Sequence, residues 1–214
     1  MRFLIPIFFS LCLLFICFSC KRVETPADTG TDYFPLKHGL IKVYSVDSVI
    51  YSSLTNKKDS FRSWSKEIIT DEQADSNGYI IYHVECYKTG DTAKGWQFSS
   101  YYFYKKNEYH VNLVKGAKTV TCFVFPVTKN RRWNKNLFNT DGPVFAWYSF
   151  VGASWRDHKD CAKVFVKEDI NIIEESVDKE VYARDTGLVY KITTNIRKDG
   201  IKKDGYSVTT KFCP

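Results

Sequence analysis

The chain has 214 residues and a formal net charge of +7, and 16% of its residues are aromatic. This length suits one domain with a hydrophobic core of its own. The basic residues are spread through short turns such as Asn56-Lys57-Lys58 and Lys202-Lys203. A nucleic-acid-binding protein gathers its basic residues on one face or segment, so this distribution argues against a nucleic-acid partner.

The N-terminus begins with the basic Arg2, continues as an apolar run over residues 3–19, and reaches the junction Ser19-Cys20. A basic residue, an apolar stretch and a small residue before the cut are typical of a secretory signal peptide, which we expect over residues 1–19. The alternative is an uncleaved membrane anchor, because Lys21-Arg22 can stop transfer. The run is shorter than the roughly 20 apolar residues that a spanning helix needs.

The sequence Cys17-Phe18-Ser19-Cys20 resembles a bacterial lipobox, although a leucine is preferred where Cys17 stands. The resemblance implies that Cys20 becomes the first residue of the mature chain and carries a diacylglycerol on its thiol. Lys21 is not the aspartate that holds many lipoproteins at the inner membrane. We therefore predict an outer-membrane lipoprotein that faces the periplasm, with residues 20–32 as a lipidated flexible tether.

Residues 33–214 carry the signs of an all-β domain. The segment around Ala162, Val164 and Val166 alternates apolar and polar residues, as a half-buried strand does. Turn dipeptides such as Asn77-Gly78 and Asp204-Gly205 separate such runs at hairpin spacing. We predict a single domain of roughly ten antiparallel strands, forming a barrel or a strongly curved sheet or sandwich.

The aromatic residues are the feature with most bearing on function. In Tyr101-Tyr102-Phe103-Tyr104 and Phe145-Ala146-Trp147-Tyr148 the rings fall on both faces of the predicted strands. Three interpretations stay open. The rings can pack the core and the sheet surface. They can line the cavity of a lipocalin-like barrel for an apolar ligand, or stack against a glycan from outside.

Four cysteines follow Cys20, and an oxidising compartment allows them to form two disulfides. Cys161 and Cys213 lie on the face opposite the main apolar set of their strands, so we predict a bridge between them first. Cys86 and Cys122 align with apolar neighbours, and we predict this pair second. The alternative is that the four remain buried thiols.

Residue patterns for catalysis or metal binding are weak. His158-Lys159-Asp160-Cys161 has suitable residue types, but a strand end explains it equally well. There is no Gly-x-Ser-x-Gly element in the sequence. We therefore predict no metal, no cofactor and no enzymatic activity, with an enzyme as a distant alternative. Asp91-Thr92-Ala93 and Asp47-Ser48-Val49 resemble a bacterial O-glycosylation signal, and Thr92, in a predicted turn, is the better candidate.

Several motifs together resemble a family of uncharacterised lipoproteins of Bacteroidota. They are Tyr33-Phe34-Pro35-Leu36-Lys37-His38-Gly39, Val43-Tyr44-Ser45-Val46-Asp47-Ser48, Phe125-Pro126-Val127, Trp133-Asn134-Lys135-Asn136 with Asn139, Tyr182-Ala183, Gly187-Leu188-Val189-Tyr190-Lys191 and Gly205-Tyr206-Ser207-Val208. Lys42 departs from the family, in which a tryptophan is common there. The resemblance implies anchoring and a compact β domain, and it implies no reaction. We expect a non-enzymatic, lipid-anchored envelope module with a binding or structural role, or alternatively a lipocalin-like carrier of an apolar ligand.

Overall fold

The computed structural model of the protein describes residues 28–55 and 57–214. The predicted signal peptide, Cys20 and the tether up to residue 27 lie outside the described residues. The described chain forms two short 3-10 helices and twelve strands. The helices are η1 (Thr31–Tyr33) and η2 (Thr92–Lys94), and the strands are β1 (Ile41–Ser52), β2 (Lys57–Ala74), β3 (Ile80–Thr89), β4 (Gln97–Lys106), β5 (His110–Lys115), β6 (Lys118–Val124), β7 (Arg132–Asn134), β8 (Phe145–Trp155), β9 (His158–Ile170), β10 (Glu174–Ala183), β11 (Gly187–Asp199) and β12 (Lys202–Cys213).

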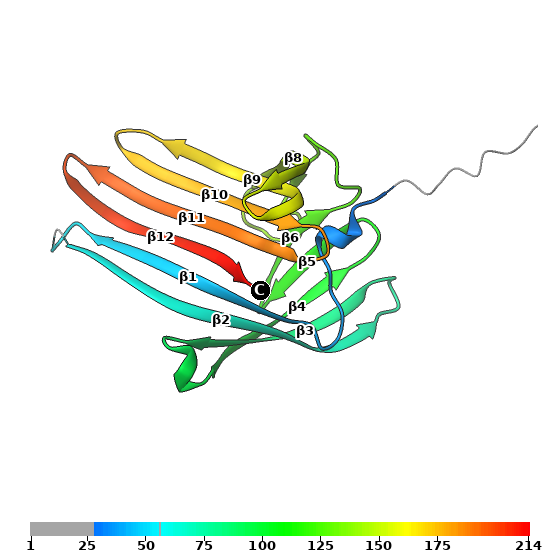
Figure 1. Ribbon diagram of the computed structural model, residues 1–214. Helices are drawn as coiled ribbons and strands as arrows, with labels where there is room; N and C mark the ends of the chain where they lie inside the picture. Colours follow the sequence, from blue (N-terminus) through cyan, green and yellow to red (C-terminus); the bar gives the residue numbers. More distant parts are fainter. Residues whose placement is uncertain (1–27, 56) are drawn as a thin grey trace, which may run out of the picture.

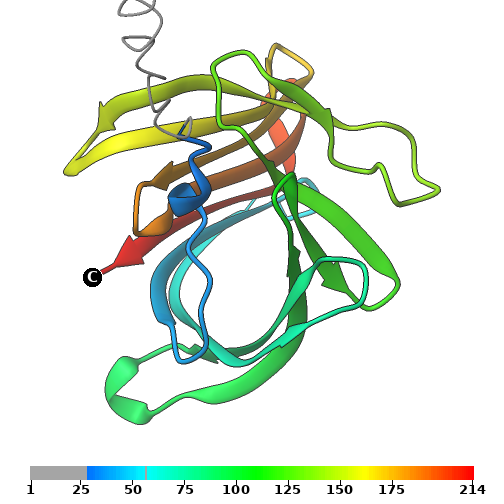
Figure 2. The ribbon, with the colours of Figure 1, turned by 90° about the vertical axis from the view of Figure 1, so that its right-hand side faces the viewer.

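All twelve strands belong to one antiparallel sheet with the order β6-β5-β4-β3-β2-β1-β12-β11-β10-β9-β8-β7. The first and last strands pair in its middle, and its two edges, β6 and β7, are consecutive in the chain. Figures 1 and 2 show the sheet curled into a nearly closed barrel. The predicted all-β, antiparallel, barrel-like fold is confirmed. The structure has twelve strands where roughly ten were predicted, and one of them, β7, has only three residues, which is too short to show an alternating pattern.

The seam between the edge strands β6 and β7 is closed in part by two side chains, those of Tyr148 and Asn139. Each bonds main-chain groups of β6 that have no strand partner on that side. The Tyr148 hydroxyl donates to the Val124 carbonyl (2.6 Å) and accepts from the Val124 N–H (3.1 Å). The Asn139 side-chain amide does the same for Thr119, donating to its carbonyl (2.6 Å) and accepting from its N–H (3.0 Å). Edge strands expose unpaired N–H and C=O groups, and these four bonds satisfy part of the β6 edge.

Alternation assigns the inner and outer faces, and one bulge changes the predicted assignment. Ala162 and Val164 point into the barrel and are fully buried. The alternation of Leu188, Tyr190 and Ile192 in the sequence predicts that these three side chains share one face. The pairing between β10 and β11 shifts at Val181/Tyr182, so Leu188 reaches the interior while Tyr190 packs in an outer cluster. A bulge adds one residue to a strand and thereby reverses the faces beyond it.

One end of the barrel is closed by the N-terminal segment, drawn in blue in Figure 2. Tyr33 and Phe34, at 1% and 5% exposure, belong to the main aromatic core at this end. The Lys106 ammonium donates to the carbonyls of Thr31 (3.1 Å) and Phe34 (2.8 Å). Residues 28–32, assigned to the tether from the sequence, therefore contact the barrel.

Arg184 fixes this segment through two of its carboxylates and also bonds a third, on β9 of the barrel. Its guanidinium bonds Asp28 (2.8 Å), Asp32 (2.5 Å) and Asp160 (2.6 Å), and it lies 4.6 Å from the centroid of the Tyr33 ring. The Tyr33 hydroxyl also donates to Asp160. The hydrogen bonds from Tyr33 and Arg184 hold the pKa of Asp160 below its usual range. We call this arrangement the Arg184 clamp.

Candidate ligand-binding lumen

The interior of the barrel holds a cavity of about 470 Å³. Ligand sites in proteins commonly measure about 300–1,000 Å³, so the space suits a small molecule. Apolar and aromatic side chains form most of the wall, and six charged side chains interrupt it. The lining residues are Phe34, Tyr44, Val46, Ser65, Glu67, Lys88, Tyr102, Tyr104, Leu113, Lys115, Val120, Cys122, Lys135, Glu180, Tyr182, Leu188, Lys191 and Thr210.

The mouth of the cavity is opposite the N-terminal segment. Lys88 and Lys115 are exposed, whereas the other lining residues are buried or half-buried. Both lysines lie at the ends of strands, β3 and β5, that begin near the closed end. Neither makes an ion pair with any carboxylate of the described residues. Two uncompensated positive charges therefore flank the opening.

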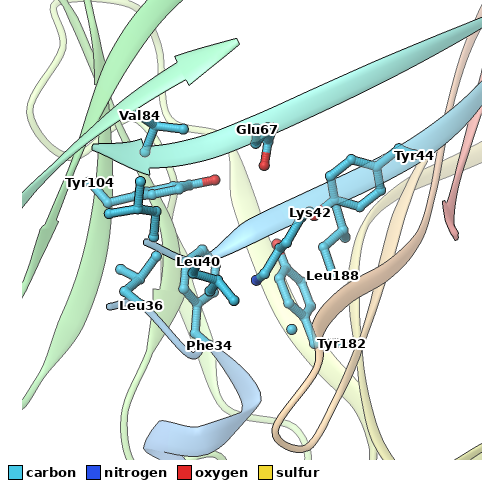
Figure 3. Close-up of a pocket in the computed structure, with 12 residues that line it drawn as sticks. Phe34, Leu36, Leu40, Lys42, Tyr44, Glu67, Val84, Tyr104, Tyr182 and Leu188 are labelled. Atoms are coloured by element: carbon cyan, nitrogen blue, oxygen red, sulfur yellow. The ribbon is translucent and has the colours of Figure 1, made fainter. Parts of the chain in front are cut away.

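A narrower apolar extension of about 50 Å³ continues toward the closed end (Figure 3). It shares Phe34, Tyr44, Glu67, Tyr104, Tyr182 and Leu188 with the main cavity and adds Leu36, Leu40, Lys42, Ile69, Val84 and Gly187. The lumen thus has lysines at its mouth and mostly aliphatic and aromatic side chains at its inner end.

Lys42 and Glu67 bring one charge of each sign into this apolar extension. They are direct cross-strand partners in β1 and β2, and Figure 3 shows both side chains extending into the cavity. A Cβ on Gly187 would lie 2.5 Å from the Lys42 Nζ, so the glycine leaves the space that the ammonium occupies. Burial lowers the pKa of Lys42 to about 8, and the Glu67 carboxylate opposes this shift. Burial also raises the pKa of Glu67.

A second group of charges lies deeper in the wall, around Glu180. Its carboxylate is 2.8 Å from the Lys191 Nζ and 3.7 Å from the Lys135 Nζ, and it accepts a 2.7 Å bond from the Tyr182 hydroxyl. Burial acts to raise the pKa of Glu180, but the two ammonium groups outweigh it and hold that pKa well below the usual range. Attraction to Glu180 likewise raises the pKa of Lys191. We call Glu180, Lys135 and Lys191 the Glu180 cluster.

The chain holds the Glu180 cluster on a firm framework. Glu180 and Lys191 are direct partners in β10 and β11, so the sheet register sets their approach. Lys135 follows β7, and its carbonyl accepts a 2.9 Å bond from the Thr121 N–H across the barrel seam. One oxygen of Asp178, two residues before Glu180, is buried without a hydrogen-bond partner. Burial raises the pKa of Asp178.

The four cysteines after Cys20 are free thiols, which contradicts both predicted bridges. Two strands separate Cys161 (β9) from Cys213 (β12), and two separate Cys86 (β3) from Cys122 (β6). Neighbouring strands lie about 4.8 Å apart, so each pair exceeds the roughly 7 Å Cα separation that a disulfide tolerates. Cys161 needs no partner to be shielded, because an outer cluster buries it completely.

The thiols of Cys122, in the lumen wall, and of Cys86, in a core cluster, are poor nucleophiles. Burial raises the pKa of Cys86 to about 11 and that of Cys122 to about 12. The thiolate is the reactive form, and it is scarce at neutral pH for both residues. Within the described residues, no three His, Cys, Asp or Glu side chains are grouped as metal ligands.

The structure separates the two O-glycosylation candidates. Thr92 begins η2 in the exposed β3–β4 connection, where the Asp91 side chain accepts a 3.0 Å bond from the Ala93 N–H. Ser48 is buried within β1, and its neighbour Asp47 bonds Arg62 and Lys211. Only Thr92 is accessible to a modifying enzyme, so it stays the candidate.

Sequence reasoning overlooked the charged residues of the lumen, although a signal for them exists. Lys42 precedes Tyr44 by two residues, and Glu180 precedes Tyr182 by two, so each charge shares a face with a buried aromatic residue. A charged residue on the inward face of a strand indicates that the face lines a cavity.

No helix among the described residues is long and apolar enough to span a membrane. Comparisons with protein-family models, with curated proteins and with solved structures find no match for the chain.

Proposed function

We propose that this protein is a non-enzymatic binding module that holds an amphipathic, anionic ligand in its lumen. The observation that carries the proposal is the polarity of the cavity of about 470 Å³, which runs from exposed lysines at the mouth to apolar side chains at the inner end. A ligand with an acidic head and an apolar tail matches this gradient. The proposal modifies the expected apolar ligand, because a purely apolar molecule offers no partner to Lys88 and Lys115 at the mouth.

Charge supports an acidic rather than a basic head group. Four lysines and two glutamates line the main cavity. Glu180 is already engaged by Lys135 and Lys191. Lys88 and Lys115 are therefore the cations available to a carboxylate or phosphate, and charge-assisted hydrogen bonds to such groups are among the strong ones in proteins.

The inner end supports an apolar tail. Leu36, Leu40 and Leu188 meet Phe34 and Tyr104 there, and the space between them is enclosed by the N-terminal segment. Transfer of apolar surface from water into such a space is favourable by about 25 cal/mol per Å². Burial of the tail gives the ligand its affinity, and the lysines at the mouth orient its acidic head toward the opening.

We also propose that the module is anchored in the outer membrane by acylated Cys20 and faces the periplasm. The signal-like residues 1–19 and the Ser19-Cys20 junction support this proposal, as does the resemblance to Bacteroidota lipoproteins. Native mass spectrometry of the protein purified from its own envelope tests both ideas. We expect a chain that begins at Cys20 with acyl groups attached and a co-purifying acidic amphiphile. An unacylated N-terminus contradicts the anchor, and an empty lumen contradicts the ligand.

A direct binding assay uses a fluorescent fatty acid, cis-parinaric acid, with its methyl ester as the uncharged probe. We expect the double variant Lys88→Gln/Lys115→Gln to weaken binding of the acid at least about tenfold, the equivalent of about 1.4 kcal/mol. It should leave binding of the ester nearly unchanged. Lys129→Gln, an exposed lysine outside the lumen, is the control for net charge.

Occupation of the lumen itself is tested by filling it. Val46 lines the main cavity, and Val46→Trp places an indole in that space. We expect this variant to fold and to lose both probes. If Val46→Trp binds as well as the wild type, the probes bind elsewhere and the lumen is not the site.

A further inference from the structure

Three long hairpins extend on one side of the mouth and carry apolar residues at their turns. The most exposed are Leu54 between β1 and β2 (96%), Ile172 between β9 and β10 (89%) and Ile201 between β11 and β12 (90%). Figure 1 shows the three turns at the end of the molecule opposite the N-terminal segment. Single exposed apolar side chains are common on protein surfaces, but three at the turns of neighbouring hairpins place apolar groups together at one end of the molecule.

Two of these hairpins are joined. Strands β1 and β12 pair as far as Tyr51 and Gly205. The Ser53 N–H donates to the Asp204 carboxylate (3.3 Å), and the Lys203 ammonium lies 5.5 Å from the centroid of the Tyr51 ring. Leu54 and Ile201 therefore belong to one surface. We define the basic tip as residues 50–55, 57–59 and 197–206.

Charge distinguishes the basic tip from the third hairpin. The basic tip has six basic residues and three acidic ones, namely Lys57, Lys58, Arg197, Lys198, Lys202 and Lys203 against Asp59, Asp199 and Asp204. The third turn, residues 167–175, has four acidic residues and one basic one. Lys198 contacts Glu175 at 3.6 Å, which places the boundary between the two surfaces. Ile172 is thus an equally exposed apolar residue in an acidic setting.

We propose that the basic tip docks on a lipid bilayer with anionic headgroups, inserting Leu54 and Ile201 between them. Apolar side chains flanked by lysines suit the boundary between headgroups and acyl chains, where the lysine ammonium groups reach the lipid phosphates. A protein partner fits less well, because protein interfaces are depleted in lysine and enriched in aromatic residues and arginine. The inference is independent of the ligand in the lumen.

The position of the basic tip allows its binding to a membrane to be tested separately from the N-terminal anchor. Residues 28–34 lie at the far end of the barrel from the basic tip (Figure 1), so a chain anchored through the acylated Cys20 proposed above can present the tip to a second membrane. The full chain is reconstituted into phosphatidylcholine vesicles. Fluorescent vesicles of phosphatidylcholine alone, or with phosphatidylglycerol, are then added, and their capture is measured by co-flotation.

We expect the wild type to capture the anionic vesicles and to leave the neutral ones free. Leu54→Ser/Ile201→Ser should reduce capture at least about tenfold, and Lys202→Gln/Lys203→Gln should also reduce it. Ile172→Ser is the matched control, because it removes a similarly exposed isoleucine from the acidic hairpin, and it should capture vesicles like the wild type.

Three results would overturn the proposal. The first is equal capture of neutral and anionic vesicles by the wild type. The second is unchanged capture by Leu54→Ser/Ile201→Ser. The third is capture only when both vesicle populations carry the protein, which assigns the basic tip to contact with a second copy of the chain. All the substituted side chains are exposed, so circular dichroism spectra of the variants should match that of the wild type.

Discussion

Two ion clusters of opposite sign stand at different depths in this barrel. In the Arg184 clamp, one cation meets three carboxylates, and the guanidinium side chain is 25% exposed. In the Glu180 cluster, one carboxylate meets two ammonium groups, and the Glu180 side chain is 5% exposed. The number of partners is similar, but the surroundings differ.

The comparison shows that burial, more than the number of ion pairs, decides how much each cluster contributes to the free energy of unfolding. Water screens the clamp and competes for its charges, so each pair contributes little. In the Glu180 cluster, Glu180 and Lys135 are shielded from water, with side chains 5% and 9% exposed, while Lys191 is half-buried. Loss of Glu180 leaves Lys135 charged and unpaired in a medium of low dielectric constant. We therefore expect the clamp to position the N-terminal segment and the Glu180 cluster to be essential to the fold.

Removal of the central charge of the Glu180 cluster should have the largest effect. We expect Glu180→Gln to reduce the free energy of unfolding by about 3–5 kcal/mol, because Lys135 is left as an unpaired buried cation and the half-buried Lys191 also loses its partner. Urea denaturation at neutral pH measures the change. The triple replacement Lys135→Met/Glu180→Leu/Lys191→Met should recover much of the loss, and failure to recover it would mean that shape rather than charge is decisive.

Lys42, in the apolar extension of the lumen, offers an intermediate case that a series of pH values can test. The pKa of Lys42 falls from 10.5 to about 8 on folding, so its charge penalises the native state below pH 8. As pH rises from about 8 to 10.5, the folded protein holds fewer protons on Lys42 than the unfolded chain, and the penalty disappears.

We therefore expect the stability of Lys42→Met relative to the wild type to be greatest below pH 8. This relative gain should decline by about 1–3 kcal/mol toward pH 10.5. The difference between variant and wild type is the quantity to measure, because the lumen thiols and tyrosines lower the stability of both proteins at high pH. A pH-independent difference would mean that Lys42 is well solvated. Lys129→Met, on the surface, is the control.

The smallest effect is expected at the clamp. Arg184→Ala should reduce the free energy of unfolding by only about 1–2 kcal/mol, the sum of a few partly exposed ion pairs. Hydrogen exchange should nevertheless accelerate in residues 29–34 while the strands stay protected. A global loss of protection would show that the clamp supports the whole barrel. The contribution of Asp160 should also fade in acid: it is fully present above the usual pKa of 3.8 and is lost as pH falls from there through the lowered pKa of the folded state.

Local patterns in the sequence were sufficient for the strands and the fold class. Period-two alternation around Ala162 and Val164 predicts a strand with one buried face, and the structure buries both residues completely. Aromatic and β-branched residues between turn dipeptides predict antiparallel hairpins. These features depend on residues close together in the chain, so they can be recognised without knowledge of the fold.

The charged lining of the lumen and the separation of the cysteines depend on which strands become neighbours, and therefore on residues far apart in the chain. Lys135 reaches Glu180 only because the sheet curls until its two edges meet, and no local pattern encodes that closure. Cys161 and Cys213 lie in cleanly alternating strands, yet the strand order keeps them apart.

The sequence by itself thus determined that this protein is an all-β domain with a signal-like apolar N-terminus, because alternation and hydropathy act over neighbouring residues. Only the tertiary structure decided which charges face inward, that the predicted cysteine pairs lie apart and which hairpin turns protrude. Those features follow from strand order, register and the bulge between Leu188 and Tyr190, where a shift of one residue moves a side chain from the lumen to the outer surface.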